Sequence, residues 1–207
     1  MHRFGIPLRW AATKNAPREA ALELDILISG IGGQGVQLVG KVLALAATAM
    51  GRHVMLSGDY GGQMRGGSTV ATLVIGDQRL RALPIIPSAG CAIALHHKFW
   101  ENVGPRLRPG SLVVAEDGIA GDLPDMARHR LLRIPATEIA LAAGNRMAAG
   151  MAIMGAFAAL TDSVTIEALV TAMAEQIPPY RRQHIETNEK AIRAGAAHAL
   201  AMQEAAA

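Results

Sequence analysis

The sequence predicts an α/β fold with a Rossmann-like βα sheet, mostly parallel, closed by a helical C-terminal segment. Residues 24–29 form a short apolar run rich in β-branched types, which is typical of a buried parallel strand. A glycine cluster at residues 30–35 follows, and residues 36–50 then place apolar side chains on one helical face. This order of strand, glycine turn and helix is the opening of a dinucleotide-type βαβ unit.

Further strands follow at short intervals. Gly51 ends the first helix, and a second strand leads into a glycine-rich loop at residues 57–67. We expect a helix around residues 99–107 and a turn at Pro109 and Gly110. The strands after the first are predicted at residues 53–56, 68–75, 91–95, 111–115 and 131–134.

After Pro135 the pattern becomes helical. Asn145 is expected to cap the long apolar helix, whereas Asp162 and Ser163 offer cap oxygens for the one after it. We expect one domain over residues 23–207, with residues 1–22 as an appended N-terminal arm. The predicted helices cover residues 136–143, 145–160, 165–176 and 179–201.

Composition excludes several classes of protein. Hydrophobic residues make up 51% of the chain and charged residues 18%, so the chain folds into a globular domain. The net charge of +3 is too small to indicate nucleic-acid binding. The longest uncharged run, residues 147–161, is shorter than the roughly 20 residues of a membrane helix. We therefore expect no nucleic acid and no membrane span.

The single cysteine, Cys91, can form no internal disulfide and cannot hold an iron–sulfur cluster, which generally needs four ligands. We expect a cytoplasmic chain whose metal clusters, if any, lie on a partner. The basic arm at residues 1–22 suits a docking segment, an organelle presequence or a start assigned too far upstream, and of these we favour docking.

Gly30, Gly32 and Gly35 have the spacing of a phosphate-binding turn, in which the first glycine permits the tight turn and the helix N-terminus attracts anions. A tight turn without a ligand is the alternative. A nicotinamide site would add an acidic residue about 20 positions on, and Asp59 lies 24 residues after Gly35. A glycine-rich loop and an immediate strand follow Asp59 in place of the expected crossover helix, which weakens the dinucleotide interpretation.

Other candidate residues are few. Arg65, which two glycines follow, could reach an anion or remain solvated, and the same alternatives hold for Arg181 and Arg182. His96 and His97 fit a strand-end pair as well as a ligand site. The sequence contains no recognisable triad or zinc-ligand spacing. We therefore predict no catalytic residue and no metal ligand on this chain, and an active site completed by other subunits.

Taken together, the motifs resemble the γ subunit of the 2-oxoacid:acceptor oxidoreductases, typified by pyruvate:ferredoxin oxidoreductase. The resemblance rests on the run Gly-Ile-Gly-Gly-Gln-Gly-Val at residues 30–36 and on Tyr-Gly-Gly-Gln-Met-Arg-Gly-Gly at residues 60–67. It continues with Gly144 and Asn145 before a small-residue helix, and with Asn188 and Gly195.

The resemblance implies oxidative decarboxylation of a 2-oxoacid to an acyl-CoA. Thiamine diphosphate, Mg²⁺ and [4Fe-4S] clusters would lie on the partner subunits, namely α, β and a ferredoxin-like chain, with ferredoxin or a similar protein as acceptor. This chain would bind coenzyme A and assist assembly. By match of motif, the implied coenzyme A residues are Gly32, Gly33, Gln34, Gly35, Val36, Arg65, Asn145 and Arg182.

One departure leaves the substrate open. Residues 61–63 read Gly-Gly-Gln where Gly-Pro-Glu is usual in the family. Two other functions remain as alternatives: a stand-alone NAD(P)-binding oxidoreductase domain, and a non-catalytic assembly module whose glycine loop only packs on the α subunit.

Overall fold

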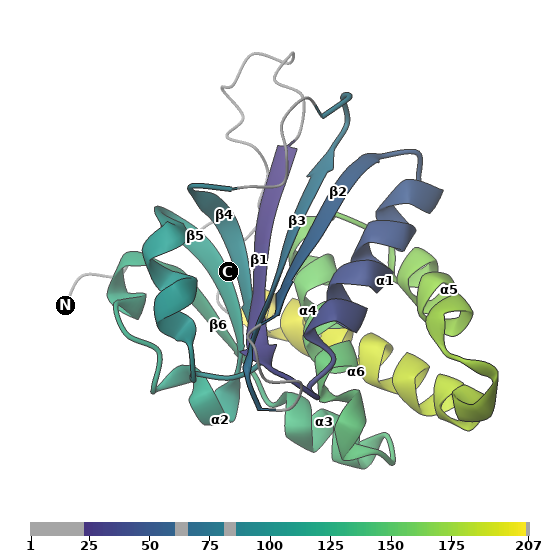
Figure 1. The fold of residues 1–207 in the computed structure, drawn as a ribbon. Helices are drawn as coiled ribbons and strands as arrows, with labels where there is room; N and C mark the ends of the chain where they lie inside the picture. Colours follow the sequence, from purple (N-terminus) through teal and green to yellow (C-terminus); the bar gives the residue numbers. More distant parts are fainter. Residues whose placement is uncertain (1–22, 61–65, 81–85, 206–207) are drawn as a thin grey trace.

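The computed structural model describes residues 23–60, 66–80 and 86–205. The described residues form a six-stranded sheet in the order β2-β3-β1-β4-β5-β6 (Figure 1). Strands β1, β4, β5 and β6 pair in parallel, and β3 is antiparallel to both of its neighbours, so the mostly parallel sheet is confirmed. The strands are β1 (Glu23–Ile31), β2 (His53–Tyr60), β3 (Ser68–Gly76), β4 (Ala89–Ala94), β5 (Leu107–Glu116) and β6 (Arg130–Ile134). The predicted arm, residues 1–22, lies outside the described residues.

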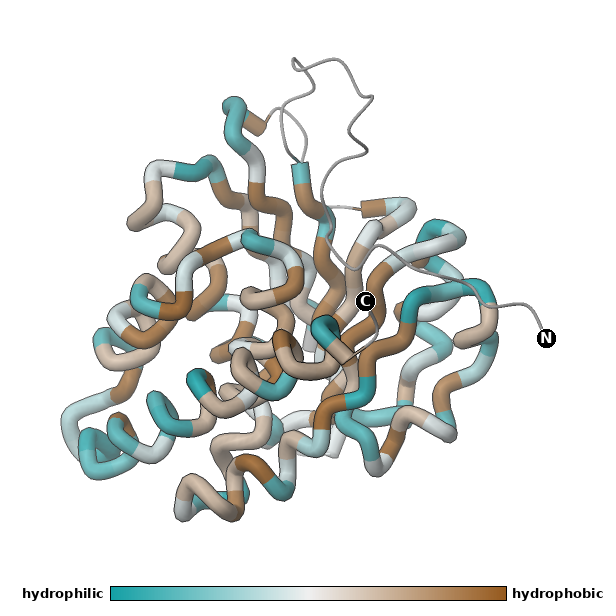
Figure 2. The backbone as a smooth tube through the Cα atoms, turned by 180° about the vertical axis from the view of Figure 1, so that it is seen from behind, coloured by the Kyte–Doolittle hydropathy of each residue, from teal (hydrophilic) through white to brown (hydrophobic). Residues whose placement is uncertain are grey.

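Helices α1, α4, α5 and α6 cover one face of the sheet (Figure 1), and the larger apolar core lies between them and the strands. A smaller core around Trp100 and Val103 covers the other face. Figure 2 shows apolar residues concentrated along the strands. The helices are α1 (Val36–Ala49), α2 (Asp117–Ala120), α3 (Ala136–Ala142), α4 (Ala149–Thr161), α5 (Ile166–Gln176) and α6 (Ile185–Ala205). Short 3-10 turns are η1 (Trp100–Asn102), η2 (Gly104–Arg106), η3 (Met126–Arg128), η4 (Arg146–Ala148) and η5 (Pro179–His184).

Three predictions around the strands were wrong, and the third is the turn expected at Pro109 and Gly110. The strand predicted at residues 53–56 continues to Tyr60, because its second half pairs with β3 in a hairpin. The helix predicted at residues 99–107 is replaced by η1 and η2, because Gly104 and Pro105 interrupt helical hydrogen bonding. The Pro109–Gly110 pair lies within β5, beside a shift in the β4–β5 register.

The helix boundaries also differ from the predictions. Asp162 does not cap α5; it ends α4 in a left-handed conformation, with φ of +50°. The cap of α5 is Thr165, whose side-chain oxygen accepts from Ala168 N–H at 3.1 Å. The last α-helix begins at Ile185 rather than at residue 179, where η5 begins. Within the described residues, no helix has the length and apolar character needed to cross a membrane.

Candidate functional site

The glycine loop, residues 32–35, joins β1 to α1 at the carboxyl edge of the sheet. Gly33 and Gly35 have φ of +105° and +79°, a left-handed backbone that favours glycine. Gly32 instead pairs with the second glycine motif. Its N–H donates to the Gly67 carbonyl oxygen at 2.9 Å, and its own carbonyl accepts from Gly66 N–H at 3.3 Å. The end of the second motif, Gly66 and Gly67, therefore lies beside the glycine loop, and Gly32 has no free N–H for a ligand.

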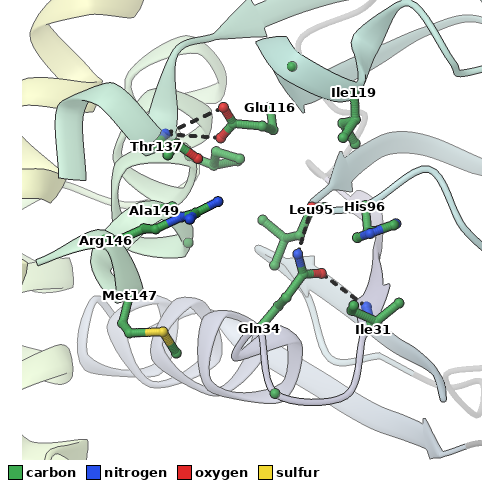
Figure 3. Close-up of a pocket in the computed structure, with 14 residues that line it drawn as sticks. Ile31, Gln34, Leu95, His96, Glu116, Ile119, Thr137, Arg146, Met147 and Ala149 are labelled. Carbon is green, nitrogen blue, oxygen red and sulfur yellow. Dashed lines mark hydrogen bonds between the residues drawn. The ribbon is translucent and has the colours of Figure 1, made fainter. Parts of the chain in front are cut away.

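Gln34 fixes the loop to the sheet. Its Oε1 accepts from Ile31 N–H at 3.0 Å, and its Nε2 donates to the Leu95 carbonyl oxygen at 3.2 Å (Figure 3). The side-chain amide thus joins the ends of β1 and β4, so Gln34 positions the loop.

Gly30 lies within β1 rather than in the turn. A Cβ at Gly30 would come within 2.8 Å of Val36 Cγ2 and 2.9 Å of Gln34 Oε1, so close packing requires this glycine.

The N-terminus of α1 has no side-chain cap. Gly35 occupies the cap position, and the first turn contains no acidic residue. Uncapped N–H groups and the helix dipole make such a terminus suited to an anion. The side chain of Val36 is buried in the core, so only its backbone can contribute to a ligand site.

A cavity of about 660 Å³ opens beside this terminus (Figure 3). It lies beyond the carboxyl ends of β1, β4 and β5, where open α/β sheets bind their ligands. The N-terminal ends of α3 and α4 form its other side. Its lining comprises Ile31, Gly33, Gln34, Leu95, His96, Glu116, Gly118, Ile119, Thr137, Arg146, Met147, Ala149, Gly150 and Ile153.

The large cavity contains groups of both charges. The Glu116 carboxylate accepts from Thr137 N–H at 3.1 and 3.4 Å, while burial raises the pKa of Glu116 above its usual value. Arg146 extends into the cavity from η4 (Figure 3). Burial, with smaller effects of His97 and Lys98, lowers the pKa of His96 and so favours its neutral imidazole.

A second cavity of about 150 Å³ lies on the α6 side of the glycine loop. Asn145 borders it: its Oδ1 accepts from Met147 N–H at 3.0 Å, and its Nδ2 lies 3.4 Å from His184 Nδ1. The predicted capping role of Asn145 is confirmed, at η4 directly before α4. The lining of this small cavity comprises Gly33, Gln34, Gly35, Leu38, Asn145, Met147, Gly150, Met151, Ile177, Arg181, His184 and Asn188.

The structure thus brings four of the eight expected site residues together. Gly33, Gln34 and Gly35 border the small cavity with Asn145. Arg182 lines neither cavity, whereas its neighbour Arg181 lines the small one. Arg65 lies outside the described residues. No group of three potential metal-ligating side chains occurs within residues 23–60, 66–80 and 86–205.

Sequence reasoning assigned no role in the site to Glu116, Thr137 or Arg146. A signal did exist for Glu116, because it directly follows the apolar run at residues 111–115 and so falls at the carboxyl end of a strand. Arg146 directly follows Asn145, which the sequence marks both as a cap and as an implied coenzyme A residue, but nothing in the local pattern singles out Arg146 itself. Thr137 enters the site only through the place of α3 beside β5, which the local sequence does not show.

Comparison with known proteins identifies relatives over most of the chain. Residues 25–198 match the family model described as pyruvate ferredoxin/flavodoxin oxidoreductase. The 2-oxoglutarate synthase subunit KorC of Methanothermobacter thermautotrophicus is 33% identical, over 83% of this chain and 92% of that protein. The ketoisovalerate oxidoreductase subunit VorA of Methanothermobacter marburgensis is 32% identical over 67% of this chain, which spans only 28% of that longer protein.

Solved structures share the fold. The γ subunit of keto/oxoacid ferredoxin oxidoreductase from Geobacter sulfurreducens is 27% identical with a TM-score of 0.73, covering 86% of this chain and 99% of that one. The 2-oxoglutarate:ferredoxin oxidoreductase from Magnetococcus marinus is 21% identical with a TM-score of 0.75, covering 86% of this chain and 31% of that one. The chain therefore belongs to the pyruvate ferredoxin/flavodoxin oxidoreductase family, as a γ-type subunit of a 2-oxoacid oxidoreductase.

Proposed function

We propose that this γ-type subunit binds coenzyme A for a thiamine-diphosphate-dependent 2-oxoacid:acceptor oxidoreductase. The observation that carries the proposal is the uncapped N-terminus of α1, which the glycine loop places between the two cavities. Coenzyme A carries a diphosphate and a 3′-phosphate, and such groups suit a helix N-terminus with arginines nearby. Arg146 borders one cavity and Arg181 the other. The Magnetococcus marinus structure was solved with 2-oxoglutarate, coenzyme A and succinyl-CoA bound.

The reaction assigns this chain a binding role. Thiamine diphosphate, Mg²⁺ and [4Fe-4S] clusters are proposed on α, β and ferredoxin-like partners, with ferredoxin or a similar protein as acceptor. The backbone N–H groups of Gly33 and Gly35 and the guanidinium of Arg181 would hold coenzyme A while its thiol reaches the acyl group on the partners. We place the complex in the cytoplasm.

The sheet order weighs against the NAD(P) alternative. In the dinucleotide fold, the acidic ribose ligand ends the strand beside the one that carries the glycine turn. Here β3 separates β1 from β2, and Asp59 lies on β2, paired with Val70. One whole strand width therefore lies between Asp59 and the strand that enters the glycine loop.

Replacing Gly35 by valine in the assembled oxidoreductase tests the proposal. The substitution strains the left-handed backbone and adds a side chain at the cavities, where no atom lies within 4 Å except Leu38 Cβ at 4.0 Å. We expect the KM for coenzyme A to rise about tenfold or more, equivalent to the loss of one charge-assisted hydrogen bond. The KM for the 2-oxoacid should change much less, as should the reduction of an artificial acceptor before coenzyme A enters.

Gly51→Val is the matched control. Gly51 lies at the other end of α1 with φ of +78°, and a Cβ there would meet no atom within 4 Å. It therefore carries the same backbone strain but lines neither cavity. An unchanged KM for coenzyme A in assembled Gly35→Val enzyme rejects the proposal. Subunit dissociation with all activities falling together would instead support the assembly-module alternative.

A further inference from the structure

Asn188 is a buried amide that the proposed phosphate contacts do not use. It lies on α6, the residue is only 8% exposed, and it lines the small cavity. No hydrogen bond joins its side-chain amide to another described residue, although Asn145 and His184 beside the same cavity pair with each other. Asn188 borders the cavity, and no described side chain or backbone group bonds to its amide. The amide is therefore available to a ligand that supplies both a donor and an acceptor.

The walls around Asn188 are mainly apolar. They include Leu38, Met147, Met151 and Ile177, and methionine and branched side chains pack well on the faces of flat rings. The volume of about 150 Å³ matches that of a cavity known to hold a benzene-sized ring. Met147 and Arg181 at the opening are exposed, so a larger ring can extend outward.

We propose that the small cavity binds the adenine ring of coenzyme A and that the Asn188 amide recognises its edge. The inference rests on the proposed function. Asparagine pairs with adenine through two hydrogen bonds, accepting from the N6 amine and donating to N7. The ribose would then lie at the mouth of the cavity. Arg181 and His184 lie at this mouth and would bind the 3′-phosphate, and the N-terminus of α1 would bind the diphosphate.

Placing the adenine in the small cavity also predicts the path of the pantetheine arm of coenzyme A. The pantetheine arm is uncharged, and Gly33, Met147 and Gly150 are shared between the small and the large cavity. The arm would therefore leave the glycine loop along the large cavity, away from Asn188. The two halves of coenzyme A thus contact different residues and can be tested separately.

The test compares two competitive inhibitors of coenzyme A in the assembled oxidoreductase, adenosine 3′,5′-bisphosphate and 4′-phosphopantetheine. In Asn188→Leu, which removes both hydrogen-bonding groups at similar volume, the inhibition constant of the bisphosphate should rise about tenfold to a hundredfold. That of phosphopantetheine should stay the same. Thr187→Val, a polar-to-apolar change at the adjacent position of α6, is the control and should change neither constant.

Each other outcome overturns the inference. Equal inhibition of wild type and Asn188→Leu by the bisphosphate means that adenine binds elsewhere, and an equal rise for both inhibitors means that Asn188 only supports the fold. If Asn188→Leu does not assemble, Asn188→Ala takes its place with the same expectation. The proposed function fails separately, through an unchanged KM for coenzyme A in Gly35→Val.

Discussion

At the scale of single residues, Glu116 couples the large cavity to pH. Burial, its largest influence, raises the pKa of Glu116, and hydrogen bonds from Thr137 only partly oppose this. Between the ordinary and the raised pKa, the folded chain binds more protons than the unfolded chain. The free energy of unfolding therefore contains a contribution that is present below the ordinary pKa and is lost as pH rises through this window.

Replacing Glu116 by glutamine should remove this fall of the free energy of unfolding with rising pH, because the amide does not titrate and can still accept from Thr137 N–H. Denaturant unfolding of the full chain at a series of pH values upward from about 4 measures how the free energy of unfolding depends on pH. Asp125→Asn, the loss of an exposed carboxylate that is not among the groups acting on Glu116, is the control and should keep the wild-type slope. A slope in Glu116→Gln as steep as in wild type contradicts the assignment.

Residues that act through local geometry were predictable, and those that act through distant partners were not. The cap at Asn145 follows from its place before a small-residue helix, and its oxygen does accept from Met147 N–H. The sequence also marked Gln34 as part of the loop. It could not show that the Gln34 amide is occupied by Leu95, which lies 61 positions away.

At the scale of elements, α4 and α6 cross at very short distance because both present glycines. A Cβ added at Gly155 would collide with the backbone of Ile192, and one at Gly195 with the backbone of Ala152. Backbone cannot move aside as a side chain can. Gly155→Ala should therefore destabilise the fold by roughly 1–3 kcal/mol, as overpacking generally does.

Gly121→Ala is the matched control for that change, since a Cβ there meets nothing within 4 Å. Chemical denaturation of both variants compares their free energies of unfolding with that of the wild type. A Gly155→Ala chain as stable as Gly121→Ala would show that α4 and α6 can separate without cost, and would remove the reason for glycine at this crossing.

Helices and strands with strong hydrophobic patterns were predicted well. Elements whose extent depends on pairing with a distant strand, or on a glycine or proline that interrupts a helix, were not. Five apolar runs and the helix after the glycine loop were found close to their observed bounds. The second half of β2 contains Gly58 and Asp59, which read as loop residues, and pairing with β3 makes them a strand. The sequence also could not show that β3 lies between β1 and β2, because strand order depends on contacts across the whole sheet.

At the scale of the whole molecule, the site opens onto a surface suited to partners. Met147 at the rim of both cavities is 73% exposed, and Leu141 on α3 nearby is 58% exposed. Large apolar side chains exposed around a binding site often mark a protein interface. Under the proposed function, the partner subunits would bind at this surface.

We therefore predict that the purified chain has no 2-oxoacid-dependent dye reduction, even with thiamine diphosphate, Mg²⁺ and coenzyme A added. In the proposed function, thiamine diphosphate, Mg²⁺ and the iron–sulfur clusters lie on partner subunits, and this chain supplies only contacts to coenzyme A. A tagged chain should instead co-purify with larger subunits that show iron–sulfur absorption and turn over the 2-oxoacid. Turnover by the isolated chain comparable to that of the complex would refute the division of labour. A colourless chain that binds NAD and recruits no subunit would favour the dinucleotide alternative.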